Sequence, residues 1–313
     1  VLPIDAAAIG NIAMTFVPVR TKDWNWTINV NAARNIGILK EMYDGWDITQ
    51  PHETDYGTYF GSAFYVYNFV GRKMGEIWGA KLLEVAPEGS YYLDADGNKV
   101  DCSGQYIIDS KTGYPSISDE KRCIGNINPD WTGGISTSLR WKDLTLSMAF
   151  SAQIGGDTYS VTAAVLGQQG KLTNTLEGRN DGLVAEGVNV VGTDENGNMI
   201  CQVNNTITEN IYNYYKDYAA NRYNLEAYTY DTSFLKLKEL RLEYNFPKSL
   251  MSKQKVLQGV SLAAYATNVF CLTDYPFYDP EAGTMNGTSM LRGAEAGSYP
   301  MARTYGFNLK LKF

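Results

Sequence analysis

The amino-acid sequence predicts an all-β fold, part of a transmembrane antiparallel β-barrel with long extracellular loops. Two observations predict it: long segments in which apolar and polar residues alternate, and connections between them that are short and long in turn. Alternation with a period of two gives a strand one apolar and one polar face. A barrel strand needs only about 10 residues to cross a bilayer. No apolar run here approaches the roughly 18 residues that a transmembrane helix needs.

The most regular alternation lies in residues 131–155, WTGGISTSLRWKDLTLSMAFSAQIG. Apolar residues recur at every second position on both sides of Lys142-Asp143, which predicts two long strands joined by a two-residue turn. Each strand has about 11 residues, roughly double the usual length in globular proteins. We therefore expect one face toward lipid and the other toward a wet lumen. The lipid-facing residues would be Leu144, Leu146, Met148 and Phe150, and the lumen-facing residues Arg140, Ser147 and Ser151.

The same alternation recurs in residues 24–35 (WNWTINVNAARN), in residues 234–246 (FLKLKELRLEYNF) and at the end of the chain. Trp, Tyr and Phe edge the apolar faces at the strand ends, as an interfacial aromatic girdle requires. We predict about nine strands. They are residues 12–19, 24–35, 61–70, 76–85, 131–142, 144–155, 234–246, 259–270 and 303–313.

The connections between these segments fall into two classes that alternate along the chain. The short ones include PVRTKD, GRKMG and Lys142-Asp143, whereas the long ones are roughly residues 36–60, 86–130, 156–233 and 271–302. Outer-membrane barrels have short turns on one side and long extracellular loops on the other. Compact soluble domains rarely carry several connections longer than about 15 residues. Because single-chain bacterial barrels have even strand numbers, an odd count predicts that further strands precede Val1.

Composition excludes several classes of function. The net charge of −7 and the isoelectric point near 4.9 argue against nucleic-acid binding. The single histidine, His52, lies in a polar stretch, and the four cysteines form no CxxC pair. Most acid–base and metal mechanisms therefore lack their side chains, so we expect neither an enzyme nor a resident cofactor.

Five segments resemble one family, the SusC-like TonB-dependent outer-membrane transporters. They are PVRTKDWNW (18–26), IGNINPDWTGGIST (124–137), DTSFLKLKELRLEYNFP (231–247), TNVFCLTDYPFYDPE (267–281) and GSYPMARTYGFNLKLKF (297–313). The resemblance spans the whole chain and corresponds to the C-terminal part of the family's barrel.

The resemblance implies a protein of the bacterial outer membrane whose barrel has roughly 22 strands around a plugged lumen. Residues 1–313 would be its last nine or so strands, and the plug, the TonB box and the early strands would precede them. It implies TonB-dependent import of oligosaccharides or peptides. The implied partners are a SusD-like surface lipoprotein, the TonB complex and outer-membrane lipid, in a dimer of transporter–lipoprotein pairs. Phe313 resembles the C-terminal aromatic residue that the barrel-assembly machinery reads.

Two other readings of the residues stay open. A passive outer-membrane porin would share the barrel but would lack a plug and a lid. A secreted β-rich domain that binds or hydrolyses glycans would need a cleft with two carboxylates, and Asp and Glu are plentiful in this chain.

Candidate substrate-binding residues are the aromatic side chains of the last two long connections. Sugar rings stack on aromatic faces, although mutual packing explains most aromatic clusters equally well. Lumen-facing Glu239 and Arg241 would orient polar groups of the substrate. The aromatic candidates are Tyr212, Tyr215, Tyr218, Tyr275 and Tyr278.

Two further patterns concern calcium and the cysteines. Asp94, Asp96 and Asn98 form a fragment of a calcium loop without its distal Glu. Because TDENGNMIC at 193–201 is similar, a hairpin turn is the alternative interpretation. Cys102 and Cys123 fall in one long loop outside the cytoplasm, where disulfides persist, so we predict a bond between them. The rival pairing is Cys102–Cys201, because each cysteine follows an Asp-rich turn.

Overall fold

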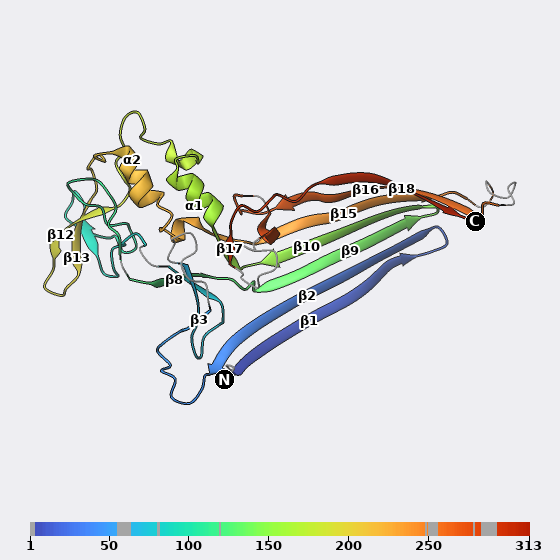
Figure 1. Ribbon diagram of the computed structural model, residues 1–313, viewed down its shortest axis with the longest axis horizontal. Coiled ribbons are helices and arrows are strands. Elements are labelled where there is room, and N and C mark those ends of the chain that lie inside the picture. Colours follow the sequence, from blue (N-terminus) through green and yellow to red (C-terminus); the bar gives the residue numbers. More distant parts are fainter. Residues whose placement is uncertain are drawn as a thin grey trace.

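A computed structural model describes residues 4–54, 64–79, 82–118, 120–247, 249, 256–277, 279–282 and 293–313. Seven long strands, here called the wall sheet, pair antiparallel in chain order (Figure 1). They are β1 (Ile4–Arg20), β2 (Trp24–Glu41), β9 (Trp131–Trp141), β10 (Leu144–Ile154), β15 (Phe234–Asn245), β16 (Gly259–Leu272) and β18 (Thr304–Lys312). No helix in the described part of the chain is long and apolar enough to cross a membrane.

The register of the wall sheet separates an apolar face from a polar face, as the alternation predicts. Leu146 of β10 lies opposite Leu139 of β9 and Leu242 of β15. Its neighbour Ser147 lies opposite a serine of β9 and Arg241 of β15. Leu242 is 45% exposed, although it lies in the middle of the sheet. The register thus confirms that the apolar residues of β10 share one face, and an apolar face this open suits the predicted contact with lipid.

Aromatic side chains gather where the short turns join the wall strands. The rings of Trp24 and Trp141 stack with 5.8 Å between their centroids. Tyr244 and Phe246 make an edge contact at 5.1 Å at the end of β15. These rings stand at the same end of the sheet, because Trp24 pairs with Trp141 beside the β9–β10 turn and Leu144 pairs with Tyr244. This row matches the predicted aromatic edge.

The predicted number of nine wall strands is wrong, because residues 61–70 and 76–85 do not join the wall sheet. Their described parts form β4 (Phe64–Asn68) and β5 (Glu76–Gly79), which pair with β3 (His52–Thr54) and β8 (Arg122–Asn126) in a separate sheet. Phe64, Val66 and Ile77 are buried. These strands alternate like the wall strands, but their apolar face packs on protein. Their short length distinguishes them from membrane-crossing strands.

The described parts of the long connections 42–130, 155–233 and 273–303 fold together into one body at one end of the wall sheet, here called the loop subdomain (Figure 1). Besides the sheet of β3, β4, β5 and β8, it has a four-stranded and a three-stranded sheet. The first contains β12 (Val188–Thr193), β13 (Met199–Val203), β6 (Tyr91–Leu93) and β7 (Lys99–Asp101). The second contains β14 (Thr229–Asp231), β11 (Asp157–Ser160) and β17 (Ala294–Glu295).

The helices of the loop subdomain are short. Helix α1 spans Val161–Gln168, and α2 (Ile211–Asn213) continues as a π-helical stretch over Tyr214–Ala219. Short 3₁₀ turns occupy Thr173–Thr175, Glu226–Tyr228 and Pro280–Ala282.

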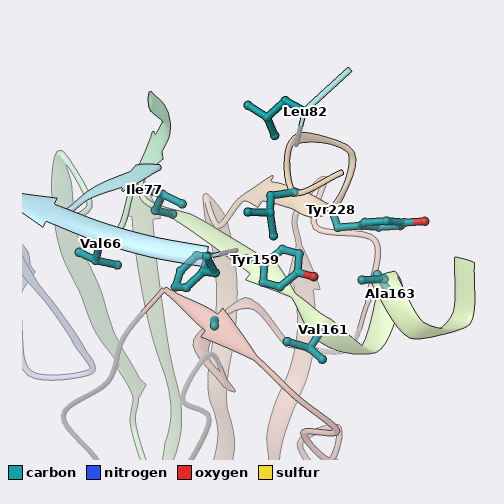
Figure 2. Packing of buried hydrophobic residues seen from close by; sticks show 11 residues of the cluster. Val66, Ile77, Leu82, Tyr159, Val161, Ala163 and Tyr228 are labelled. Carbon is teal, nitrogen blue, oxygen red and sulfur yellow. The ribbon is translucent and has the colours of Figure 1, made fainter. Parts of the chain in front are cut away.

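One buried hydrophobic cluster holds the three long connections together (Figure 2). Phe64 and Ile77 come from the first connection, Tyr159 and Tyr228 from the second, and Ala294 from the third. The rings of Phe64 and Tyr159 stack at 5.5 Å. A core assembled from three connections makes the loop subdomain a folded unit rather than a set of independent loops.

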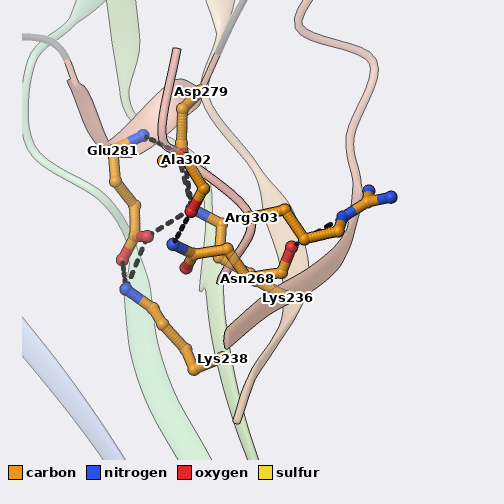
Figure 3. Close-up of polar contacts among 7 residues, drawn as sticks. All are labelled: Lys236, Lys238, Asn268, Asp279, Glu281, Ala302 and Arg303. Atoms are coloured by element: carbon orange, nitrogen blue, oxygen red, sulfur yellow. Dashed lines mark hydrogen bonds and ion pairs between the residues drawn. The ribbon is translucent and has the colours of Figure 1, made fainter. Parts of the chain in front are cut away.

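A cluster of ion pairs attaches the third connection to the wall sheet (Figure 3). The Lys236 ammonium of β15 lies 2.5 Å from carboxylate oxygens of both Asp279 and Glu281, and its side chain is 2% exposed. Lys238 binds the same Glu281 carboxylate at 2.6 Å but is 36% exposed. We call these four residues the lysine clasp.

Candidate functional site

Two helical ends of the second long connection form a pocket. Ser160 caps α1 by accepting a hydrogen bond from Ala163 N, and Asn210 caps α2 by accepting from Tyr212 N and Asn213 N. Between the end of α1 and α2 lies a cavity of about 350 Å³, here called the tyrosine pocket. It is lined by Gln168, Gln169, Gly170, Thr175, Arg179, Ile211, Tyr212, Tyr215 and Lys216.

The tyrosine pocket carries positive charge in a chain with a net charge of −7. Arg179 is fixed by hydrogen bonds from its guanidinium to Thr175 O and Gly170 O, both at 2.7 Å. The Lys216 ammonium lies 5.5 Å from the centre of the Tyr212 ring. The described residues that line the pocket include no Asp or Glu. A ligand with a carboxylate therefore meets the Arg179 guanidinium and the Lys216 ammonium there, although Lys216 also pairs with Asp217 at 3.7 Å.

Two of the predicted tyrosines provide the aromatic surface of this pocket. The Tyr212 side chain is 65% exposed, so a face of its ring is open to a ligand. Tyr215 is partly buried, and its hydroxyl donates a hydrogen bond to Glu177 O at 2.9 Å. Partial burial raises the pKa of Tyr215, so its hydroxyl stays protonated near neutral pH. Rings and donors of this kind bind and orient a ligand, and they supply no acid–base chemistry.

A second cavity, of about 290 Å³, is also lined by Tyr215. Glu177, Glu186 and Tyr214 line it, so its charge is opposite to that of the tyrosine pocket. Burial raises the pKa of Tyr214 to about 12. Tyr215 lines both cavities and joins an acidic and a basic surface.

Tyr218 and Tyr275 do not line the tyrosine pocket. Tyr218 stacks on Tyr114 with 4.7 Å between the ring centroids. Tyr275 is 6% exposed and makes an edge contact with Tyr230 at 5.9 Å. Burial leaves Tyr275 almost no surface for a substrate, which corrects its proposed role as a stacking residue. Tyr278 lies outside the described residues.

Glu239 and Arg241 lie on the polar face of β15, as the alternation predicts. They pair in register with Ala149 and Ser147 of β10. The Arg241 guanidinium is bound by Glu243 at 2.7 Å, whereas Glu239 is exposed. Neither residue lines the tyrosine pocket, so the predicted site divides into a loop part and a wall part.

Sequence reasoning missed the two basic residues of the tyrosine pocket. Lys216 follows Tyr212 by four residues, and that helical spacing is a signal that could have placed its charge beside the ring. Arg179 lies between Gly178 and Asn180 in a polar stretch with no regular pattern. It reaches the pocket only because the chain folds back onto the end of α1.

The GNINPDW segment builds the junction between the wall sheet and the loop subdomain. Asn126 and Asn128 both donate side-chain hydrogen bonds to Met74 O. Asn126 N donates to the Asp157 carboxylate at 2.8 Å. Burial, together with nearby Asp231 and Asp130, raises the pKa of Asp157. The segment connects the first and second long connections at the top of β9, so its role in this structure is positional.

The suggested calcium fragment forms a hairpin turn. The Asp94 carboxylate accepts hydrogen bonds from Asp96 N and Asn98 N at 3.0 and 2.8 Å between β6 and β7. These bonds, led by the one from Asn98 N, lower the pKa of Asp94. Asp194 accepts from Asn198 N in the same way between β12 and β13. The hairpin interpretation is confirmed, and calcium binding stays a prediction. The described residues contain no group of three or more His, Cys, Asp or Glu placed to hold a metal ion.

The predicted Cys102–Cys123 disulfide is wrong, because the two residues lie in different sheets. Cys102 is buried directly after β7, whereas Cys123 is exposed on β8, opposite Trp78 of β5. In this structure no disulfide bond joins any of the four cysteines, all of which lie in its described part. The prediction relied on proximity in the sequence, but β7 and β8 belong to two different sheets.

Comparisons with known proteins find TonB-dependent receptors and a solved importer that are similar to this chain. No protein-family profile matches the chain. The TonB-dependent receptor P3 of Formosa agariphila is 27% identical over 310 residues, which cover 94% of this chain and 27% of that protein. The TonB-dependent receptor SusC of Bacteroides thetaiotaomicron is 22% identical over 324 residues, covering 95% and 25%. The chain thus spans about a quarter of the length of these relatives.

Solved structures show the same fold. The RagAB peptide importer in its closed-closed state superposes with a TM-score of 0.61 at 20% identity, over 99% of this chain and 29% of that chain. The open-open state gives a TM-score of 0.58 at 18% identity, also over 99% and 29%. Along almost its whole length the chain is therefore similar to TonB-dependent receptors, SusC among them, and its fold matches one part of the barrel of the RagAB importer.

Proposed function

We propose that this chain is part of an outer-membrane importer that takes up oligosaccharides or peptides by TonB-dependent transport. One observation supports this most strongly. A wall sheet with an open apolar face carries its long connections at one end, folded into a subdomain with a ligand-sized pocket. A membrane-spanning wall sheet that carries a folded loop subdomain at one end suits the selective binding of a substrate at the cell surface. The relatives described above are named as TonB-dependent receptors and as a peptide importer.

In this proposal the tyrosine pocket is a point of substrate contact. A sugar or aromatic ring stacks on Tyr212, and a carboxylate of the same substrate binds Arg179 and Lys216. An acidic oligosaccharide or a peptide with a free carboxylate has this combination. Glu239, on the lumen side of β15, is placed to meet a substrate only after it has left the loop subdomain.

The partners follow from the proposed activity. A SusD-like surface lipoprotein would close over the loop subdomain and trap the substrate, in a dimer of transporter–lipoprotein pairs. The TonB complex would supply energy through a part of the protein outside residues 1–313. Outer-membrane lipid would cover the apolar face of the wall sheet, and Phe313, directly after β18, would serve the assembly machinery.

The test is growth and uptake by a strain that carries the full-length protein, on a panel of acidic and neutral oligosaccharides and peptides. A ring stack contributes about 1 kcal/mol, so Tyr212→Ala should weaken uptake about fivefold, and adding Arg179→Ala should weaken it further. Tyr43→Ala is the control, because Tyr43 is an exposed loop tyrosine that does not line the pocket.

Three outcomes would contradict the proposal. Uptake that persists without TonB would indicate a passive porin. Recovery of the protein in the soluble secreted fraction, or hydrolysis of a substrate by the purified protein, would overturn the importer itself. Wild-type uptake of every substrate by the Tyr212/Arg179 double variant would remove the tyrosine pocket from the substrate path.

A further inference from the structure

Two similar hairpins from different long connections lie side by side in the loop subdomain. The β6–β7 hairpin belongs to the connection 42–130, and the β12–β13 hairpin belongs to the connection 155–233. Strand β13 pairs in parallel with β6, with Ile200 opposite Tyr91 and Cys201 opposite Tyr92. The pairing merges the two hairpins into one four-stranded sheet.

A pair of thiols meets on one side of this sheet. Cys102 follows β7, and its backbone N–H donates to Ser90 O just before β6. Cys201 lies in the middle of β13. Both belong to one hydrophobic cluster and are 1% and 4% exposed. Because β13 pairs with β6 and both cysteines pack in this cluster, the two side chains share one small apolar space, and Cys201 is close enough to help raise the pKa of Cys102. The remaining cysteines, Cys123 and Cys271, lie on β8 and β16.

We propose that Cys102 and Cys201 form a disulfide bond that cross-links the first and second long connections. An outer-membrane protein folds outside the reducing cytoplasm, where disulfides form and persist. The bond would close a loop that contains the whole β9–β10 hairpin of the wall sheet. It would therefore hold the two hairpins in register against each other across two wall strands.

The oxidant is a protein disulfide of a thiol–disulfide oxidoreductase in the cell envelope. One cysteine thiolate attacks a sulfur of that disulfide and forms a mixed disulfide, while the other oxidoreductase sulfur leaves as a thiolate. The second cysteine thiolate then attacks the mixed disulfide and releases the remaining oxidoreductase sulfur. The two cysteines lose two protons and two electrons in total, and the oxidoreductase disulfide becomes a dithiol.

Oxidation must precede closure of the hydrophobic cluster. Burial and the neighbouring Cys201 raise the pKa of Cys102 to about 11, so the folded thiol forms almost no thiolate at neutral pH. In the unfolded chain a cysteine has a pKa near 8.5 and is accessible. The bond would thus form during folding, and the same burial would afterwards shield it from reductants.

Peptide mapping of the full-length protein tests the bond directly. The protein is purified from outer membranes without reductant, its free thiols are alkylated in denaturant, and it is digested with trypsin. Lysine and arginine residues separate all four cysteines into different tryptic peptides. We expect a linked pair that joins the peptides of Cys102 and Cys201, with Cys123 and Cys271 alkylated. Quantitative alkylation of Cys102 and Cys201, or a bond from either to another cysteine, would overturn the proposal.

Thermal unfolding provides a second readout. Reductant should lower the unfolding midpoint of the wild type by about 5–10 °C, because a long closed loop is lost. The Cys102→Ala/Cys201→Ala variant should unfold at the lower midpoint with or without reductant. Cys123→Ala is the matched control and should respond to reductant like the wild type. A wild-type midpoint that does not change after complete reduction would contradict the proposed cross-link.

Discussion

The wall sheet and the loop subdomain are built from strands with the same alternating pattern, yet they hide their apolar faces in different ways. Ile135, in the middle of β9, is 44% exposed, whereas Ile77 of β5 is fully buried by other protein residues. The wall sheet leaves its apolar face to a surrounding bilayer. The loop subdomain must cover its own apolar residues, and it does so with residues from three connections. Strand alternation thus reports a two-faced strand without specifying the medium that covers it.

The two regions also differ in how they are connected. The seven wall strands pair in chain order, although the pairs β2–β9 and β10–β15 each close around a long connection. The loop subdomain joins segments that are far apart in the sequence, as in the pairing of β6 with β13. The lysine clasp links the regions, because Lys236 belongs to a wall strand and its two acidic partners to the third connection. Substitutions in the lysine clasp therefore measure how much the link between the two regions contributes to the unfolding free energy.

The largest expected effect comes from breaking this link. Lys236→Ala would leave the largely buried Asp279 carboxylate and Glu281 without their main cation. Removing one partner of a buried ion pair typically costs about 3–5 kcal/mol of unfolding free energy. Lys238→Ala is the matched control, since Lys238 is more exposed and should cost no more than about 1 kcal/mol. Urea unfolding of the protein in lipid bilayers measures both. Equal losses in the two variants would show that the clasp does not couple the regions.

The next effect tests which face of the wall sheet meets lipid. Ile135 and Ser136 are neighbours on β9 with opposite facing, and both are exposed. An arginine on the lipid face near the middle of a bilayer costs about 2–4 kcal/mol, whereas one on a wet face costs little. Ile135→Arg should therefore lower the unfolding free energy in bilayers by that amount, and Ser136→Arg should leave it nearly unchanged. The reverse order would contradict the assignment of the faces.

The smallest effect concerns alkaline pH and should be confined to the loop subdomain. Burial raises the pKa of Tyr275 to about 12, and burial also raises the pKa of Tyr228, whose hydroxyl donates to Ala220 O. Since an unfolded tyrosine ionises near pH 10, the associated stability is complete below pH 10 and is lost as the pH rises toward 12. Each tyrosine should contribute a slope of up to about 1.4 kcal/mol per pH unit.

Limited proteolysis between pH 10 and 12 measures this loss of stability, and the absorbance of tyrosinate measures the ionisation of the tyrosines over the same range. Tyr275→Phe should flatten the dependence of cleavage on pH, because phenylalanine cannot ionise. Tyr43→Phe, at an exposed loop position, should keep the wild-type profile. Cleavage that begins in the wall sheet before the loop subdomain would contradict the comparison.

The wall sheet could be predicted closely from the sequence. The hairpin at residues 131–155, the facing of Leu146 and Ser147 and the aromatic edge at Trp24 all depend on local periodicity and turn length. The pattern failed at residues 61–70, because a strand that packs on protein can alternate in the same way as one that faces lipid. Strand length did not separate the two in advance, because the alternation extends over all of residues 61–70, whereas the described β4 spans only Phe64–Asn68 and β9 spans Trp131–Trp141.

The sequence by itself therefore determined the strand pattern, the two faces of the wall and the resemblance to a family of transporters. Only the tertiary structure decided that three long connections share one core, that Tyr275 is buried while Tyr212 is open, and that Cys102 meets Cys201 rather than Cys123. The physical reason is the range of the interactions. The side of a strand to which a side chain points repeats every two residues, so it can be read from the local sequence. The contacts within the loop subdomain join residues of separate connections and exist only once the whole subdomain has folded.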